Sequence, residues 1–366
     1  MKIKPLTSLR FLFAFAVFIH HTDIFNALAL PGWEPISRVL IEGFFGVDFF
    51  FILSGFVICY AYKKSIETGK VRGDSFIVYR LARLFPVHFV TFLIAFTIHK
   101  GTFGLQAFVN LLMLQSWIPA PQSNFAFTFN AVSWSISTEL FFYLAFLLLV
   151  KVNRKNLTII FAFLCAFSLL LVAVANRGML LDAGWVLYIN PFIRVLDFIS
   201  GMLICQYTEQ YRTEQNKVEL NKIEQNRYTL MEITSLLSLF LFTTFGLLNN
   251  VNWNLKDGMF YLIPGSFIVF AFAFGRGAIS RLLSKRVFVW LGEISFSFYM
   301  IHQLVYLYVV QHYGYLITRI SHVALITCIS FFISLISATV LYYVVEKPLN
   351  NLIRKGWDKY ILKVSD

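Results

Sequence analysis

Residues 44–62, FFGVDFFFILSGFVICYAY, decide the fold, because they form an apolar run of nineteen residues broken by one carboxylate, Asp48. A transmembrane helix needs about 20 mostly apolar residues to cross roughly 30 Å of hydrocarbon. The run has this length, and it lacks the alternation of apolar and polar residues that is typical of a barrel strand. It therefore predicts one membrane-spanning helix.

Further runs of similar length predict an all-α, polytopic membrane helix bundle with about ten transmembrane helices. The predicted spans are 7–28, 44–62, 81–99, 132–150, 157–175, 186–206, 231–249, 258–275, 289–311 and 321–345. Composition agrees, since only 14% of the 366 residues are charged, whereas a soluble domain has about a quarter. A shorter apolar stretch, 103–118, is expected to be interfacial or re-entrant.

The distribution of basic residues predicts the orientation of the bundle. With the N-terminus in the cytosol, ten alternating spans leave most of the 31 Lys and Arg residues in cytosolic loops, as the positive-inside rule requires. Both termini are then cytosolic, and so is the polar segment 208–228, which we expect to be a solvated loop that can also be helical. We interpret residues 1–366 as a single transmembrane domain without an appended soluble domain.

The net charge of +12 would favour nucleic acid as the partner of a soluble protein. Cytosolic loops explain this charge more simply, so we expect the lipid bilayer and no nucleic acid as a partner. The cysteines lie singly in apolar runs, which predicts neither a disulfide framework nor a metal site (Cys59, Cys165, Cys205 and Cys328). A monomer and an oligomer are both compatible with the sequence.

Ionisable residues inside spans are energetically costly and commonly line a cavity or a pathway, so they are the candidate site residues. Arg10 and His21 share one face of the first span, eleven residues apart, which is about 16 Å along the helix axis. Asp48, Glu139 and His302 lie in three other spans. Helix rise places these carboxylates and both histidines about 18–22 Å above the cytosolic boundary, in one layer. A carboxylate beside a histidine suits general-base chemistry, so His21, Glu139 and Asp48 are candidate catalytic residues.

A structural interpretation stands beside each functional one. Arg10 can extend to the inner surface, and His21 can simply form a hydrogen bond near the outer one. Arg80 and Arg83 share a helix face at the inner end of span three, where two guanidiniums can hold phosphate. Ordinary positive-inside charge explains the same two arginines more simply.

At these residues the sequence resembles the acyltransferase-3 family of membrane O-acyltransferases. Six motifs occur in the family's order and cover about residues 6–348, although each motif alone is weak. They comprise Arg10 with His21; 46–50 with 54–56; Arg80, Arg83 and Pro86; Trp134, Ser135, Ser137 and Glu139; Ser295, Phe298, Tyr299 and His302; and Glu346, Lys347 and Pro348.

The resemblance implies an acyltransferase with acyl-CoA, most simply acetyl-CoA, as co-substrate and no permanently bound cofactor. It implies a catalytic role for His21 and acyl-CoA binding by three arginines, with a supporting polar layer around them (Arg10, Arg80 and Arg83; His302, Trp134 and Tyr299). The acceptor would be a hydroxyl of an extracytoplasmic or lipid-linked saccharide at the plasma (inner) membrane.

The alternative function is a transporter that exports a lipid-linked sugar or polysaccharide and uses the buried charges as a proton relay. Such transporters are commonly built from inverted repeats with paired broken helices. The His, Asp and Glu motifs of this sequence occur once each, which favours the acyltransferase.

Overall fold

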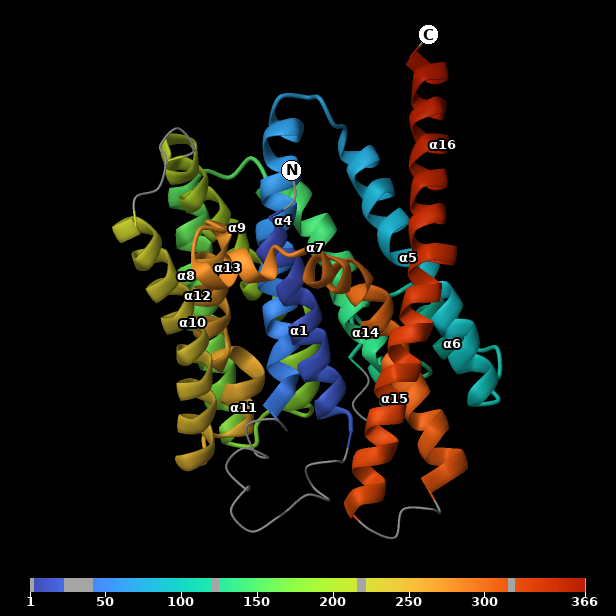
Figure 1. Ribbon diagram of the computed structural model, residues 1–366. Helices are drawn as coiled ribbons and strands as arrows, with labels where there is room; N and C mark the ends of the chain where they lie inside the picture. Colours follow the sequence, from blue (N-terminus) through green and yellow to red (C-terminus); the bar gives the residue numbers. More distant parts are fainter. Residues whose placement is uncertain (1–2, 23–41, 120–124, 216–221, 315–319, 366) are drawn as a thin grey trace.

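The computed structural model describes residues 3–22, 42–119, 125–215, 222–314 and 320–365, and these residues form helices and no strands (Figure 1). Eight of the described helices are long and apolar enough to cross a membrane, which confirms the predicted polytopic bundle. The main helix of each candidate span is α4 (Phe45–Glu67), α5 (Gly73–Ile98), α7 (Trp134–Leu149), α8 (Arg154–Asn176), α9 (Pro191–Gln215), α10 (Lys222–Leu248), α12 (Leu262–Ala273) or α15 (Ile320–Leu341).

Two further helices, α1 (Lys4–His20) and α14 (Arg286–Tyr313), match the other predicted spans but are not among those eight. The first predicted span continues to residue 28, and its last part lies outside the described residues. Both helices occupy the centre of the bundle, where α1 packs against α4 and α14. The total of ten membrane-spanning helices stays a prediction.

Two polar or short apolar segments were predicted not to be spans. Helix α6 (Leu105–Leu111) within 103–118 has seven residues, too few to span a membrane, which agrees with the expected interfacial or re-entrant segment. In the segment 208–228, which we predicted as a loop, α9 continues to Gln215 and α10 begins at Lys222. The described parts of that segment therefore extend two helices, and residues 216–221 lie outside the described part of the chain.

A helix that the sequence analysis did not predict follows the last span. The π turn η7 (Tyr342–Glu346) joins α15 to α16 (Lys347–Ser365). Helix α16 packs along α5, where the Trp357 indole Nε1 donates to the Ser75 hydroxyl at 3.0 Å. Both chain termini lie at the same end of the bundle in Figure 1, as the predicted topology requires.

Close backbone contacts at glycine hold the central helices together. A Cβ on Gly55 would lie 1.9 Å from the carbonyl oxygen of Phe198, and a Cβ on Gly201 would lie 1.9 Å from that of Ile52. Each of the helices α4 and α9 therefore has one position that must be glycine, because the backbone of the other helix lies directly against it. A Cβ on Gly292 of α14 would likewise lie 2.0 Å from the backbone of α1. Small residues at such crossings are typical of membrane helix packing, and these crossings position the site.

Candidate active site

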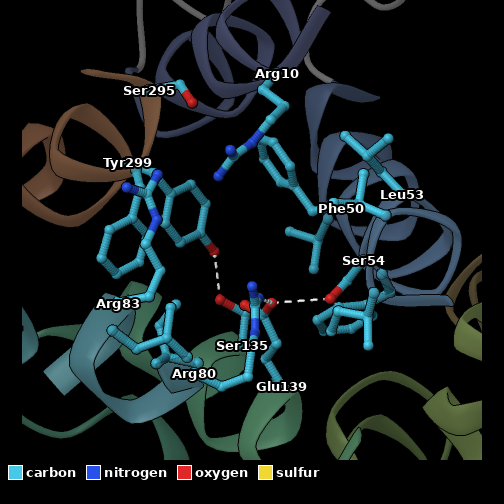
Figure 2. Close-up of a pocket in the computed structure, with 17 residues that line it drawn as sticks. Arg10, Phe50, Leu53, Ser54, Arg80, Arg83, Ser135, Glu139, Ser295 and Tyr299 are labelled. Atoms are coloured by element: carbon cyan, nitrogen blue, oxygen red, sulfur yellow. Dashed lines mark hydrogen bonds and ion pairs between the residues drawn. The ribbon is translucent and has the colours of Figure 1, made fainter. Parts of the chain in front are cut away.

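Four charged side chains from three helices converge on one cavity of about 120 Å³ (Figure 2). Arg10 enters it from α1, Arg80 and Arg83 from α5, and Glu139 from α7. Ser54 of α4 also lines this space. We call it the arginine cavity. The predicted binding arginines are thus brought together, although they come from separate parts of the sequence.

Two of the three arginines already have carboxylate partners. The Arg80 Nη2 lies 3.3 Å from Glu139 Oε1 and donates to the Tyr143 hydroxyl at 2.8 Å. Arg83 forms an ion pair with Glu346, whose side chain is fully buried. Among the described residues, Arg10 has no ion pair, and its guanidinium points into the cavity in Figure 2. Three guanidiniums against two carboxylates leave one positive charge, which suits an anionic ligand.

A second cavity, of about 80 Å³, is lined by the two consecutive histidines at the end of α1, His20 and His21. We call it the histidine cavity. Besides His20 and His21, its lining includes five aromatic residues and an amide (Phe44, Phe127, Trp134, Tyr188, Tyr299 and Gln303). Tyr299 and Val47 are the two residues that line both cavities. They therefore form the wall between the arginines and the histidines.

His21 and His302, predicted at one depth in different spans, contact each other directly. The Nδ1 of His21 lies 3.0 Å from the Nε2 of His302. His21 is the residue that ends α1, and His302 lies fully buried in the middle of α14. Tyr299, one turn before His302, has its hydroxyl 2.9 Å from Ser135 Oγ at the wall between the cavities.

The predicted carboxylate partners of His21 have other neighbours in the structure. Glu139 accepts a hydrogen bond from Ser54 at 2.9 Å and pairs with Arg80 in the arginine cavity. Asp48 forms a buried ion pair with Arg194. Helix rise determines the depth of a side chain but not the direction in which it points, so equal depth did not imply contact. Within the part of the chain that the structure describes, His302 rather than a carboxylate contacts His21.

Comparison with known proteins gives the chemistry of this arrangement. The model of a protein family described as an acyltransferase domain matches residues 4–342, a range that contains every lining residue named above. The chain belongs to the acyltransferase-3 family. With the helix bundle, this membership makes it a membrane-embedded acyltransferase.

Two relatives illustrate how far the similarity of this acyltransferase extends. It is 29% identical over 336 residues to the acyltransferase MdmB of Streptomyces mycarofaciens. This match covers 84% of this chain and 80% of MdmB. It is 26% identical over 327 residues to a Staphylococcus aureus (strain COL) protein whose name describes an O-acetyltransferase. That match covers 81% of this chain and 52% of the staphylococcal protein, so the acyltransferase spans about half of that relative. No solved structure matches the chain.

The acyltransferase also contains buried charge clusters that the sequence analysis did not predict. Arg194 pairs with Asp197 at 2.9 Å as well as with Asp48, and the i, i+3 spacing of Arg194 and Asp197 in an apolar span was a usable signal. Lys256 pairs with Glu42 at 2.5 Å. Their spacing of over two hundred residues carries no signal, because the two side chains meet only through the packing of distant helices.

Proposed function

We propose that this acyltransferase moves an acyl group, acetyl in the simplest case, from cytosolic acyl-CoA to a saccharide hydroxyl on the outer side of the plasma membrane. The observation that carries the proposal is the pair of cavities that meet at Tyr299 and Val47. A donor that bears phosphates needs cations, and an acceptor hydroxyl needs a base. The two cavities supply these groups separately, so each substrate has a compartment of its own.

The charge of the arginine cavity supports acyl-CoA as the donor. The nucleotide of acyl-CoA carries phosphates and stays at the aqueous face, while its slim pantetheine arm can enter between helices. Arg10 is the guanidinium in this cavity without an ion pair among the described residues. Helix rise separates Arg10 from His21 by about 16 Å, which is comparable to the length of an extended pantetheine arm. A phosphate near the arginines therefore leaves the thioester near the histidines.

The lining of the histidine cavity supports a saccharide as the acceptor. Trp134 and Tyr188 lie with ring centroids 4.8 Å apart, and both line this cavity together with the amide of Gln303. Aromatic faces with a few convergent polar groups form a surface on which a sugar ring can stack and be oriented. The name of the staphylococcal relative describes transfer to oxygen, which agrees with a hydroxyl acceptor.

In the proposed reaction, His21 carries one proton from the acceptor hydroxyl to the leaving sulfur, and no cofactor takes part. His21 takes the proton of the acceptor hydroxyl as its oxygen attacks the thioester carbonyl carbon. The tetrahedral intermediate then expels the CoA thiolate by breaking the carbon–sulfur bond, and His21 returns the proton to sulfur. The products are the O-acyl ester and CoA thiol. Tyr299 stands where the thioester would cross from one cavity to the other.

Transfer by the purified protein in lipid nanodiscs tests this proposal. The protein is supplied with labelled acetyl-CoA and a panel of cell-surface saccharides, and ester formation is measured by mass spectrometry, with His21→Ala as the inactive control. We expect label on saccharide with wild type only. If the protein, reconstituted in proteoliposomes, instead moves a lipid-linked saccharide across the membrane and consumes no acyl-CoA, the result would support a transporter and contradict the proposal.

A further inference from the structure

The proton positions of the two contacting histidines follow from the atoms around them, beginning with His302. Its Nδ1 lies 2.7 Å from the carbonyl oxygen of Tyr299 and 3.3 Å from that of Phe298. A carbonyl oxygen only accepts hydrogen bonds, so Nδ1 must carry a proton and donate it. A neutral His302 then has an unprotonated Nε2, and that nitrogen is an acceptor.

The orientation of His302 determines the tautomer of His21. The Nε2 of His302 lies 3.0 Å from the Nδ1 of His21, and an acceptor at that distance requires a proton on the His21 nitrogen. A neutral His21 with a proton on Nδ1 has its lone pair on Nε2. Because His21 lines the histidine cavity, this leaves Nε2 as the basic atom available to an acceptor there.

We propose that His302 is a positioning residue that holds His21 in the Nδ1–H tautomer, so that Nε2 of His21 is the atom that takes the acceptor's proton. The inference rests on the proposed function for its chemical consequence, although the tautomer itself does not. When Nε2 takes the proton, the imidazolium still donates from Nδ1 to the neutral Nε2 of His302. Among the described residues, His302 therefore stabilises the charge in the place where Glu139 or Asp48 had been expected.

The tautomer can be measured without any substrate. In protein labelled with ¹⁵N-histidine at about pH 8, where histidine is normally neutral, the ¹⁵N shifts distinguish a protonated Nδ1 from a protonated Nε2. We expect the Nδ1–H form for His21 in wild type and the Nε2–H form, which free histidine prefers, in His302→Leu. The Nε2–H form in wild type would overturn the inference.

The matched control is His88, a buried histidine that lines neither cavity and has its Nε2 2.9 Å from the carbonyl oxygen of Asn110. His88→Leu removes a similar buried ring and hydrogen bond, so we expect the His21 signals to keep the wild-type tautomer. A change of the His21 tautomer in His88→Leu as large as in His302→Leu would show a general structural effect and overturn the specific role of His302.

Kinetics then separate positioning from binding. Loss of a residue that orients a metal-bound histidine typically costs 10–100-fold. By analogy we expect His302→Leu to lower kcat by about that factor, while KM for acetyl-CoA stays within about twofold. His302→Gln places an amide oxygen near the position of Nε2 and should recover most of the lost kcat. An unchanged kcat in His302→Leu would overturn the inference.

The two proposals fail in different ways. If wild type shows the Nδ1–H tautomer of His21 but transfers no acyl group from acyl-CoA, the inference about the histidine pair holds and the proposed function is wrong. If wild type transfers the acyl group but His21 has the Nε2–H tautomer, the function holds and the role of His302 is wrong.

Discussion

Helices α8 and α14 show where chemistry can reside in a membrane bundle. The most apolar window of α8 has a mean hydropathy of 2.8, and only 17% of it is buried inside the protein. Helix α14 does not qualify as a span by composition, yet the stretch Ser295–His302 is buried throughout. The helix with the most apolar window faces outward, whereas α14, which falls short of a span by composition, carries His302. Helix α1, which carries Arg10 and leads into His21, likewise buries nine of its 17 residues.

The physical reason is the cost of polar groups in hydrocarbon. An ionisable side chain that faces lipid lacks hydrogen-bond partners, whereas one in the bundle centre finds them on neighbouring helices. Helices with such residues are therefore stable only when other helices surround them. The close contacts at glycine bring α14 against α1 and α9 against α4. The polar residues of these helices are thereby surrounded by protein and not by lipid.

The largest expected effect comes from the central helix α1. We expect His21→Ala to lower the acyl-transfer rate by at least about 10²–10⁴-fold, because a general base is lost, while acyl-CoA binding is nearly unchanged. His20→Ala is the neighbouring control and should be milder, because His20 lines the same cavity but His21 is the residue held by His302. Paired rate and donor-binding measurements check this. An active His21→Ala with an inactive His20→Ala would reassign the site.

The next largest effect concerns stability at the centre. Arg194→Met leaves Asp48 and Asp197 buried without their cation, and such a loss typically costs about 3–5 kcal/mol. Asp48→Asn should cost less, because Arg194 keeps its ion pair with Asp197 at 2.9 Å. Thermal unfolding of wild type and both variants in the same detergent measures the order of their stabilities. Equal stability of wild type and Arg194→Met would contradict the importance of this cluster.

A smaller effect is expected at the arginine cavity. Arg80→Ala combined with Arg83→Ala should weaken acetyl-CoA binding by about 2–4 kcal/mol, as the loss of charge-assisted phosphate contacts does. Arg154→Ala removes an exposed basic residue at the start of α8 and controls for charge alone. Binding by isothermal titration checks both variants. If the double variant binds acetyl-CoA with wild-type affinity, these two arginines only contribute to the positive charge on the cytosolic side and do not bind the donor.

The smallest effect should come from the periphery. Phe163 on α8 is 68% exposed, whereas Phe198 on α9 is fully buried. We expect Phe163→Leu to change the free energy of unfolding by at most about 0.5 kcal/mol, as surface substitutions usually do. The same substitution at Phe198 should cost more because it disturbs close packing. A greater loss at Phe163 would reverse the contrast between centre and periphery.

The sequence by itself determined most of the helices and the four charged residues that line the arginine cavity. Runs of apolar residues long enough to cross a bilayer identify spans whatever their partners, so α4, α5 and α8 were predictable from composition. Rare polar residues in such runs identify the chemistry, because lipid excludes them elsewhere. The eleven-residue spacing of Arg10 and His21 also predicted a shared helix face, and the structure places them in adjoining cavities.

Only the tertiary structure decided which polar residues meet. Depth along the membrane follows from helix rise, but the rotation of each helix about its axis depends on packing against its neighbours. Hence Glu139 contacts Arg80 and Asp48 contacts Arg194, although both had been expected near His21. The partner of His21 is His302, 281 residues away in the sequence. The two helices that carry them also meet at Gly292, where α14 approaches the backbone of α1 within a distance that any Cβ would prevent.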